Sequence, residues 1–170
     1  MTSLNLATDK RRLIYSGARS MLLMLCLLMN AVEAYAVRPE NLLREFSRSQ
    51  LIIVTNNNQC ILFVVFVAQT PSQRSQGLMH IESMDNHEGM IFLYRESVRI
   101  SMWMKNTLIP LDMLFIDIKH DIVSMRLDAV PQSEEAIESG KEVVAVIELN
   151  AGSVKRFKIR TGNRIIFPAG

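Results

Sequence analysis

Five side chains between positions 103 and 112 combine an aromatic ring with polar and charged groups, and they form the best candidate for a binding site. They are Trp103, Lys105, Asn106, Thr107 and Asp112, and Trp103 is the only tryptophan of the chain. An aromatic ring can stack on a ligand while amide and charged groups fix the ligand's orientation. We therefore predict a binding or accessory module that meets a small molecule or another protein through this surface.

Strand alternation indicates which of these side chains lie together. If the apolar runs around them are strands, Trp103 and Lys105 share one face while Met104 lies on the opposite face as core. A hairpin that turns over residues 106–109 would set Trp103 opposite Asp112 and would bring Lys105 within reach of Asp112. The sequence then predicts an aromatic ring flanked by a cation and an anion.

The same residues also suit a purely structural corner. Asparagine and threonine, the residue types at positions 106 and 107, commonly hydrogen-bond to backbone groups of the turn that contains them. Lys105 and Asp112 would then form a cross-strand ion pair that contributes at most about 1 kcal/mol at an exposed position. In that case the function would lie in the polar segment 132–141.

An enzyme is the alternative to a binding module. It would be a hydrolase-like protein of the cell envelope, with Asp112 and Lys105 in acid/base or charge-stabilising roles. Hydrolysis needs an activated nucleophile or two carboxylates in different environments, and the sequence shows neither arrangement. We therefore name no catalytic residue and favour the binding module.

A short acidic and histidine-containing segment is the candidate for a metal site. His80, Asp85, His87 and Glu88 lie close together in the sequence, but their spacing fits no standard ligand pattern. Gly77 and Gly89 stand alone, so no glycine-rich phosphate loop is present. We expect no metal and no cofactor.

The first 36 residues have the layout of a cleavable signal peptide. Basic residues precede the apolar run Met21 to Met29, and Ala34-Tyr35-Ala36 is a small-x-small cleavage site. The run is much shorter than the roughly 20 residues that span a bilayer. We predict cleavage after Ala36, by the general or the twin-arginine route, and a periplasmic or secreted protein. It would meet the membrane only through the signal peptide, and its partner would be a small molecule or an envelope protein.

Cleavage changes the charge balance and the cysteine count. Of 19 basic and 17 acidic residues, the leader holds four and two, so residues 37–170 carry 15 of each. A neutral domain gives no electrostatic support for nucleic-acid binding, and we expect none. Cys60 is the one cysteine left, and its apolar surroundings in the sequence predict a buried side chain.

Short apolar runs and frequent turns dominate residues 51–170, after a polar lead-in over residues 37–50 that suits one helix. Asparagines between 51–54 and 59–67 indicate a hairpin. Thr70-Pro71-Ser72-Gln73 begins a brief helix that Gly77 ends. We place connections at residues 95–97 and a short helix within 131–140. The pattern predicts a single, mainly β (α+β) domain: a compact antiparallel sandwich or open barrel with one to three short helices.

Several short motifs resemble those of a known family, domain of unknown function 192. They are Gly77-Leu78-Met79, Gly89-Met90-Ile91-Phe92, Trp103-Met104-Lys105-Asn106-Thr107, Pro110-Leu111-Asp112 with Phe115, and Glu148-Leu149-Asn150-Ala151-Gly152. The resemblance implies a small domain rich in antiparallel β structure, often exported from bacteria or archaea, and it implies no activity. One position departs from the family pattern: Gln76 stands where an arginine usually precedes the Gly-Leu-Met, with Arg74 nearby.

Overall fold

The computed structural model describes residues 43–167, and within them it shows seven strands and two short helices. The signal peptide predicted over residues 1–36 lies outside the described residues. The elements are β1 (Ser47–Val54), β2 (Cys60–Ala68), α3 (Pro71–Gln76), β3 (Glu88–Met102), β4 (Leu111–Ile116), β5 (Ile122–Ala129), β6 (Ile137–Asn150), α4 (Ser153–Arg156) and β7 (Arg164–Ile166). Neither described helix has the length and apolar character needed to cross a membrane.

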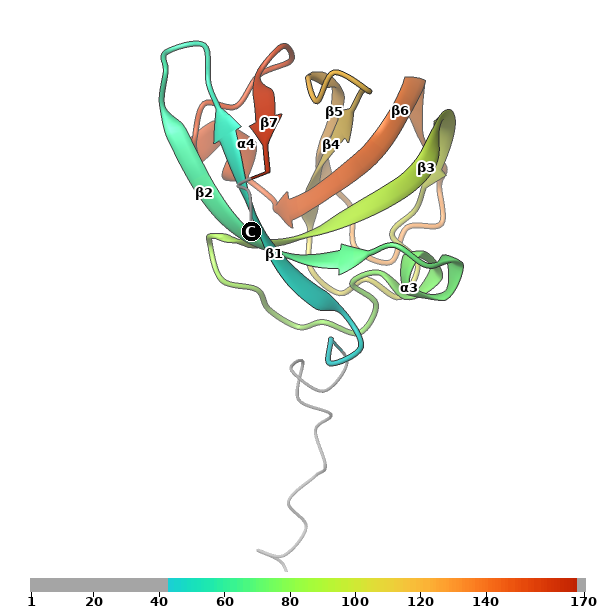
Figure 1. Ribbon diagram of the computed structural model, residues 1–170. Coiled ribbons are helices and arrows are strands. Elements are labelled where there is room, and N and C mark those ends of the chain that lie inside the picture. Colours follow the sequence, from blue (N-terminus) through green and yellow to red (C-terminus); the bar gives the residue numbers. More distant parts are fainter. Residues whose placement is uncertain (1–42, 168–170) are drawn as a thin grey trace, which may run out of the picture. The chain divides into compact units, whose positions relative to one another are not determined.

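The seven strands form one curled sheet in the order β5-β4-β6-β3-β2-β1-β7 (Figure 1). Every neighbouring pair is antiparallel except β2 and β3, which run parallel. Parallel neighbours need a crossover connection, and the segment that contains α3 supplies it. The prediction of a mainly β fold with a few short helices is confirmed, and the parallel pair is the exception to its antiparallel pattern.

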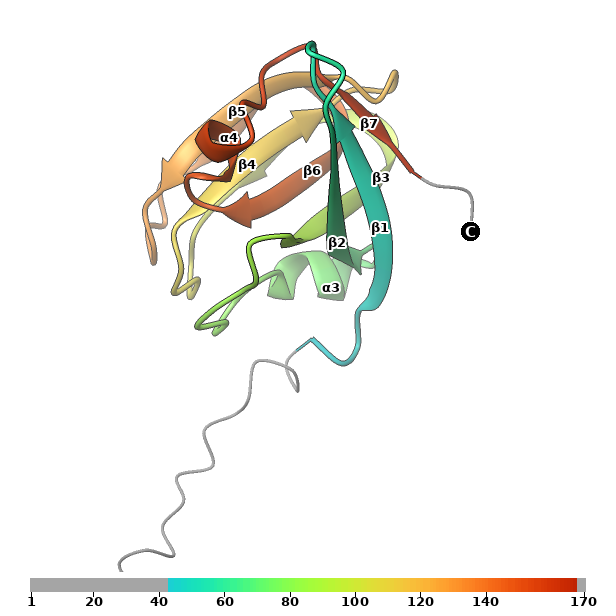
Figure 2. The same ribbon diagram turned by 90° about the vertical axis from the view of Figure 1, so that its left-hand side faces the viewer.

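The sheet closes on itself at one end, where its two edges meet. Asp121, next to β5, bridges to Arg164 of β7, and the Ile165 amide donates to the His120 carbonyl at 2.8 Å. The Arg164 guanidinium also donates to both Asp121 oxygens, with Nε 2.9 Å from Oδ1. Figure 2 shows β7 approaching the β5 side of the curl. The fold is therefore an open barrel whose edge strands are joined at one end.

The two faces of the sheet bury separate clusters of apolar side chains. All seven strands contribute to the inner cluster, which includes Ile53, Phe63, Leu114, Ile147 and Ile165. Val154 of α4 belongs to this cluster, so α4 covers the inside of the curl. The outer cluster comes mainly from β2, β3, β4 and β6, and the segment after α3 packs on it. Because β6 is buried on both faces, it separates the inner core from the layer that holds the candidate site.

Helix α3 forms where the sequence predicts it. Thr70 accepts from the Gln73 amide at 3.2 Å, and the Gln73 side chain accepts in return from the Thr70 amide at 3.1 Å. Gly77 follows the helix with a φ of 49°, a conformation that favours glycine. A Cβ at this position would also lie 3.2 Å from Phe92 Cζ. The capping box and the glycine stop are both confirmed.

Three local predictions are wrong. The end of the lead-in is strand from Ser47, because it pairs with β2. Residues 95–97 lie within β3, where a bulge joins two runs of pairing into one long strand. Residues from Ile137 onward pair with β3 instead of forming a helix.

Cys60 is exposed and not buried as predicted. It occupies the first position of β2, and its neighbour Leu62 on the same face is also exposed at 46%. The outer face of β2 is covered only farther along, where Phe66 and Ala68 join the outer cluster. An apolar sequence therefore runs through a strand whose first half has one open face.

Candidate functional site

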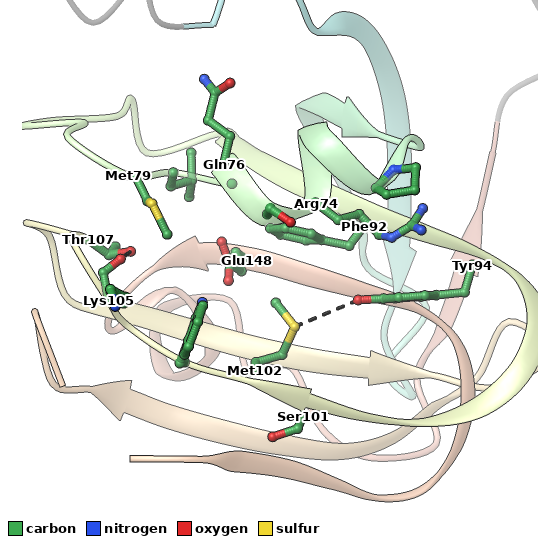
Figure 3. Close-up of a pocket in the computed structure, with 15 residues that line it drawn as sticks. Arg74, Gln76, Met79, Phe92, Tyr94, Ser101, Met102, Lys105, Thr107 and Glu148 are labelled. Carbon is green, nitrogen blue, oxygen red and sulfur yellow. Dashed lines mark hydrogen bonds between the residues drawn. The ribbon is translucent and has the colours of Figure 1, made fainter. Parts of the chain in front are cut away.

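A cavity of about 330 Å³ lies on the outer face of the sheet (Figure 3). Its walls come from α3 and the residues after it, from β3 and from the loop that follows β3, with one residue of β6. The lining includes Arg74, Met79, Phe92, Tyr94, Met102, Trp103, Lys105, Thr107 and Glu148. A volume of this size is at the lower end of the range for small-molecule sites.

Glu148 is the acidic residue of this cavity, and strand pairing places it there. It lies in the middle of the sheet, opposite Met90 of β3 on one side and Met113 of β4 on the other, both fully buried. Only 4% of Glu148 is exposed, and its side chain lines the cavity. Figure 3 shows this group among the side chains that line the cavity. Burial raises the pKa of Glu148 to about 8, so the carboxyl is mostly protonated at neutral pH.

Gly89 makes the placement of Glu148 possible. It pairs with Leu149 in the neighbouring strand, and a Cβ at position 89 would lie 2.5 Å from the Glu148 carbonyl oxygen. The same Cβ would lie 2.7 Å from Leu149 Cδ2. Only a residue without a side chain allows β6 to run this close.

Arg74 and Tyr94 form one wall of the cavity. Arg74 Nη1 donates to the carbonyls of Gln69 at 2.8 Å and Leu93 at 3.1 Å, and its guanidinium lies 5.0 Å from the Tyr94 ring centroid. The Tyr94 hydroxyl donates to Met102 Sδ at 3.8 Å. Burial raises the pKa of Tyr94, the Arg74 charge partly offsets this, and Glu148 adds to it. Arg74 is thus held by the fold and does not pair with Glu148.

Trp103 and Lys105 lie at the mouth of the cavity. Trp103 is 49% exposed and the neighbouring Met104 is buried, as predicted, although both lie in the loop after β3 and not in a strand. Lys105 Nζ lies 5.4 Å from the Trp103 ring centroid and 3.7 Å from Glu134 Oε1, with both charged side chains well exposed. The mouth therefore carries an aromatic ring and a cation that is only loosely paired.

Asn106 and Thr107 shape the loop around the mouth. Asn106 has a φ of 54°, its carbonyl accepts from the His80 amide at 2.9 Å, and its side chain donates to Met79 Sδ at 3.8 Å. Thr107 is buried and lines the cavity, and its carbonyl accepts from the Gln132 amide. Asn106 thus ties the two loops of the mouth together, while Thr107 lines the cavity.

Asp112 lies away from the other four predicted residues. Strand β6 runs between β3 and β4, so the predicted hairpin is wrong, and Asp112 pairs with Leu149 instead of Trp103. Because Met113 is the residue opposite Glu148, Asp112 and the cavity lie on opposite faces of the sheet. The structure thus does not bring Lys105 and Asp112 together as an ion pair or as an acid/base pair.

The Asp112 carboxylate serves the backbone of the inner face. It is 1% exposed, Oδ1 accepts from the Asp128 amide at 3.1 Å, and Oδ2 accepts from the Val154 amide at 2.9 Å. Val154 lies in the first turn of α4, whose N-cap Gly152 has no side chain to offer. Asp112 therefore caps this helix from a neighbouring strand.

Two of the four residues considered for a metal make other side-chain contacts. His87 Nδ1 lies 2.9 Å from the Leu62 carbonyl, and its ring packs against Phe63 and Phe157. Glu88 pairs with Arg48 at 3.6 Å. Over residues 43–167, no three histidine, cysteine or acidic side chains gather in a way that could hold a metal ion.

Glu148 is the site residue that sequence reasoning missed. The signal was a carboxylate near the end of the apolar run 142–149. In a central strand buried on both faces, such a residue has no solvent face to occupy, so it must meet a partner or a cavity.

Comparisons with known proteins bear on the whole domain. The family model of DUF192, described as "Uncharacterized ACR", matches residues 52–167. A crystal structure from Sinorhizobium meliloti 1021, provisionally described as a transcription regulator, is 40% identical, covers 72% of this chain and 95% of that one, and has a TM-score of 0.71. A protein of unknown function from Novosphingobium aromaticivorans DSM 12444 is 28% identical, covers 71% and 85%, and has a TM-score of 0.68. No curated protein matches the sequence.

Proposed function

This chain belongs to the DUF192 family, and we propose that it is a ligand-binding module whose outer cavity takes a small molecule. The observation that carries the proposal is the Glu148 carboxyl, which is only 4% exposed, lines the cavity and has a pKa raised by burial. Burying an ionisable carboxyl group among apolar side chains costs free energy, so its retention needs a reason outside stability. A ligand that completes its hydrogen bonds supplies that reason.

The lining fits a small organic ligand. Phe92, Tyr94 and Met102 give apolar walls, and Thr107 adds a hydroxyl group. Trp103 at the mouth is free to cover a bound molecule, because half of its surface is exposed. Apolar walls with a few placed polar groups are the usual composition of such sites.

The predicted site residues take different parts in this proposal. Trp103, Lys105 and Thr107 contact the ligand together with Glu148. Asn106 holds the mouth through its bond to His80, and Asp112 supports the fold from the inner face.

A ligand screen by Trp103 fluorescence and thermal shift tests the proposal. We expect binders to change the fluorescence of the chain and to raise its Tm, and we expect Glu148→Gln to remove both responses. Glu142→Gln is the matched control, since Glu142 lies exposed on the same strand. A ligand that binds equally well to Glu148→Gln would place the site elsewhere, and a diverse library without any binder would remove the proposal.

We also propose that the domain works outside the cytoplasm. The leader pattern over residues 1–36 supports this location. In a bacterial host, we expect the mature protein in the periplasm or medium to begin at Val37 by mass spectrometry. Recovery of the intact chain from the cytoplasm alone would contradict export.

The provisional description of the Sinorhizobium protein adds no second candidate here. Regulation through direct contact with DNA relies on basic surface charge. Residues 37–170 carry equal numbers of basic and acidic residues, so the domain has no net attraction for a nucleic acid.

A further inference from the structure

We propose that the ligand of this cavity is a small zwitterion, with its ammonium group on Glu148 at the floor and its anionic group beside Lys105 at the mouth. The inference rests on the proposed function and names the chemical class of the ligand.

The floor of the cavity lacks a counter-charge. Glu148 lies between the buried Met90 and Met113, and the Tyr94 hydroxyl of the wall already donates to Met102. Burial is the cause of its raised pKa. Arg74 donates to the Gln69 and Leu93 carbonyls, and Lys105 pairs with Glu134. Neither cation is therefore placed to neutralise this carboxylate. A ligand ammonium group carries both the missing charge and up to three N–H donors.

The mouth has the opposite character. Lys105 is tied to Glu134 by a 3.7 Å contact between side chains that are 41% and 65% exposed. Such exposed pairs are weak, so Lys105 can turn to a ligand anion at little cost. Arg74 adds a second positive charge to the lining while it stays bound to the Gln69 and Leu93 carbonyls.

This polarity separates three ligand classes. A simple anion would pair with the cations of the mouth, but its other end would offer Glu148 no positive charge. A simple amine would pair with Glu148, but its positive charge would be repelled by Arg74 and Lys105. A zwitterion satisfies both ends, and its methylene groups lie against Phe92 and Met102.

Binding by this mode is coupled to proton release. The titratable groups that face Glu148 are Arg74 from α3, Tyr94 from β3 and Lys105 from the following loop. The raised pKa of Tyr94 leaves its hydroxyl neutral between pH 5 and 8. An ammonium ligand binds the carboxylate form, so its apparent affinity rises about tenfold for each pH unit and levels off above pH 8.

Matched ligand series on the full chain test the inference. The zwitterions are the unbranched amino acids from glycine to 6-aminohexanoate, and the controls are the alkylamines and the carboxylates of equal length. Kd is measured by calorimetry and by Trp103 fluorescence at pH 6, 7 and 8. We expect one zwitterion length to bind tightest, with about tenfold stronger binding at pH 7 than at pH 6. Calorimetry in phosphate and in Bis-Tris should show nearly one proton released at pH 6.

Two variants separate the two ends of the ligand. Glu148→Gln should abolish binding and its pH dependence, whereas Lys105→Met should weaken zwitterions about fivefold or more and leave amines unchanged. Glu142→Gln should bind as the unchanged chain does, and urea unfolding confirms that each variant is folded.

Three results would overturn the inference. One is tightest binding by the carboxylates, and another is an affinity that falls as pH rises, which would make Glu148 a hydrogen-bond donor. The third is no binding by any zwitterion. In each case the proposed function still stands if other library compounds bind in the cavity, and it fails separately if none does.

Discussion

Replacing Glu148 by glutamine should change how the stability of the fold depends on pH. The amide has nearly the same shape as the carboxyl group and cannot ionise. In the native chain the pKa of Glu148 is about 8 because of burial, against an ordinary value of 4.5. Between these two values the folded state holds a proton that the unfolded state has lost. The contribution of Glu148 to stability is therefore full below pH 4.5 and is lost as pH rises through about 8.

The size of the effect follows from this pH window. Each pH unit within it changes the free energy of unfolding by about 1.4 kcal/mol, so the whole window corresponds to about 5 kcal/mol. That is a large share of the 5 to 15 kcal/mol that stabilises a typical domain. Glu148→Gln should lack this loss and should become the more stable of the two proteins toward pH 8.

Urea unfolding at each pH from 5 to 9 measures the difference directly. The quantity to plot is the free energy of unfolding of the native chain minus that of Glu148→Gln, with Glu142→Gln as the exposed control on the same strand. We expect this difference to fall steadily between pH 5 and 8 and to flatten above. Parallel curves for the native chain and Glu148→Gln would refute the reasoning, since Glu148 would then titrate alike in the folded and unfolded states.

Three further predictions concern Asp112, Lys105 and Cys60. Asp112→Asn should lower the free energy of unfolding, measured in urea, by about 1 to 3 kcal/mol, because an amide N–H replaces one of two buried acceptor oxygens. The control Asp128→Asn should change it by no more than about 0.5 kcal/mol. Equal losses in the two variants would show that Asp112 does not cap α4. Lys105→Met should also stay within about 0.5 kcal/mol, and a larger loss would show that its pair with Glu134 supports the fold. The Cys60 thiol should react with DTNB in native buffer, so that Cys60→Ala lowers the titrated count by one thiol per chain, and no difference before denaturant is added would mean that the thiol is covered.

The features that could be predicted from the sequence are those that depend on residues close together in the chain. The capping box at Thr70, the glycine stop at Gly77 and the burial of Met104 beside an exposed Trp103 follow from spacing over a few positions. The physics of caps, turns and alternation acts within that range. Local rules therefore placed four of the five site candidates on one loop.

Long-range pairing could not be predicted in the same way. Insertion of β6 between β3 and β4 is decided by residues far apart in the chain, and it moved Asp112 to the opposite face of the sheet from the cavity. The importance of Glu148 depends on the same event, because a carboxylate near the end of an apolar strand acquires a cavity only when the segment after α3 covers that face. Cys60 is exposed for the opposite reason, because no described residue covers this stretch of β2.

Gly89 and Glu148 belong to different strands, yet the residue type at one position constrains the other. A Cβ at position 89 would lie only 2.5 Å from the Glu148 carbonyl oxygen. A chain with a side chain at 89 must shift the backbone of β6, and the shift would carry the acid away from the cavity. The two positions should therefore vary jointly among descendants of one ancestor. A relative that has lost the glycine is expected to have lost the buried acid, and the chemistry of its pocket, as well.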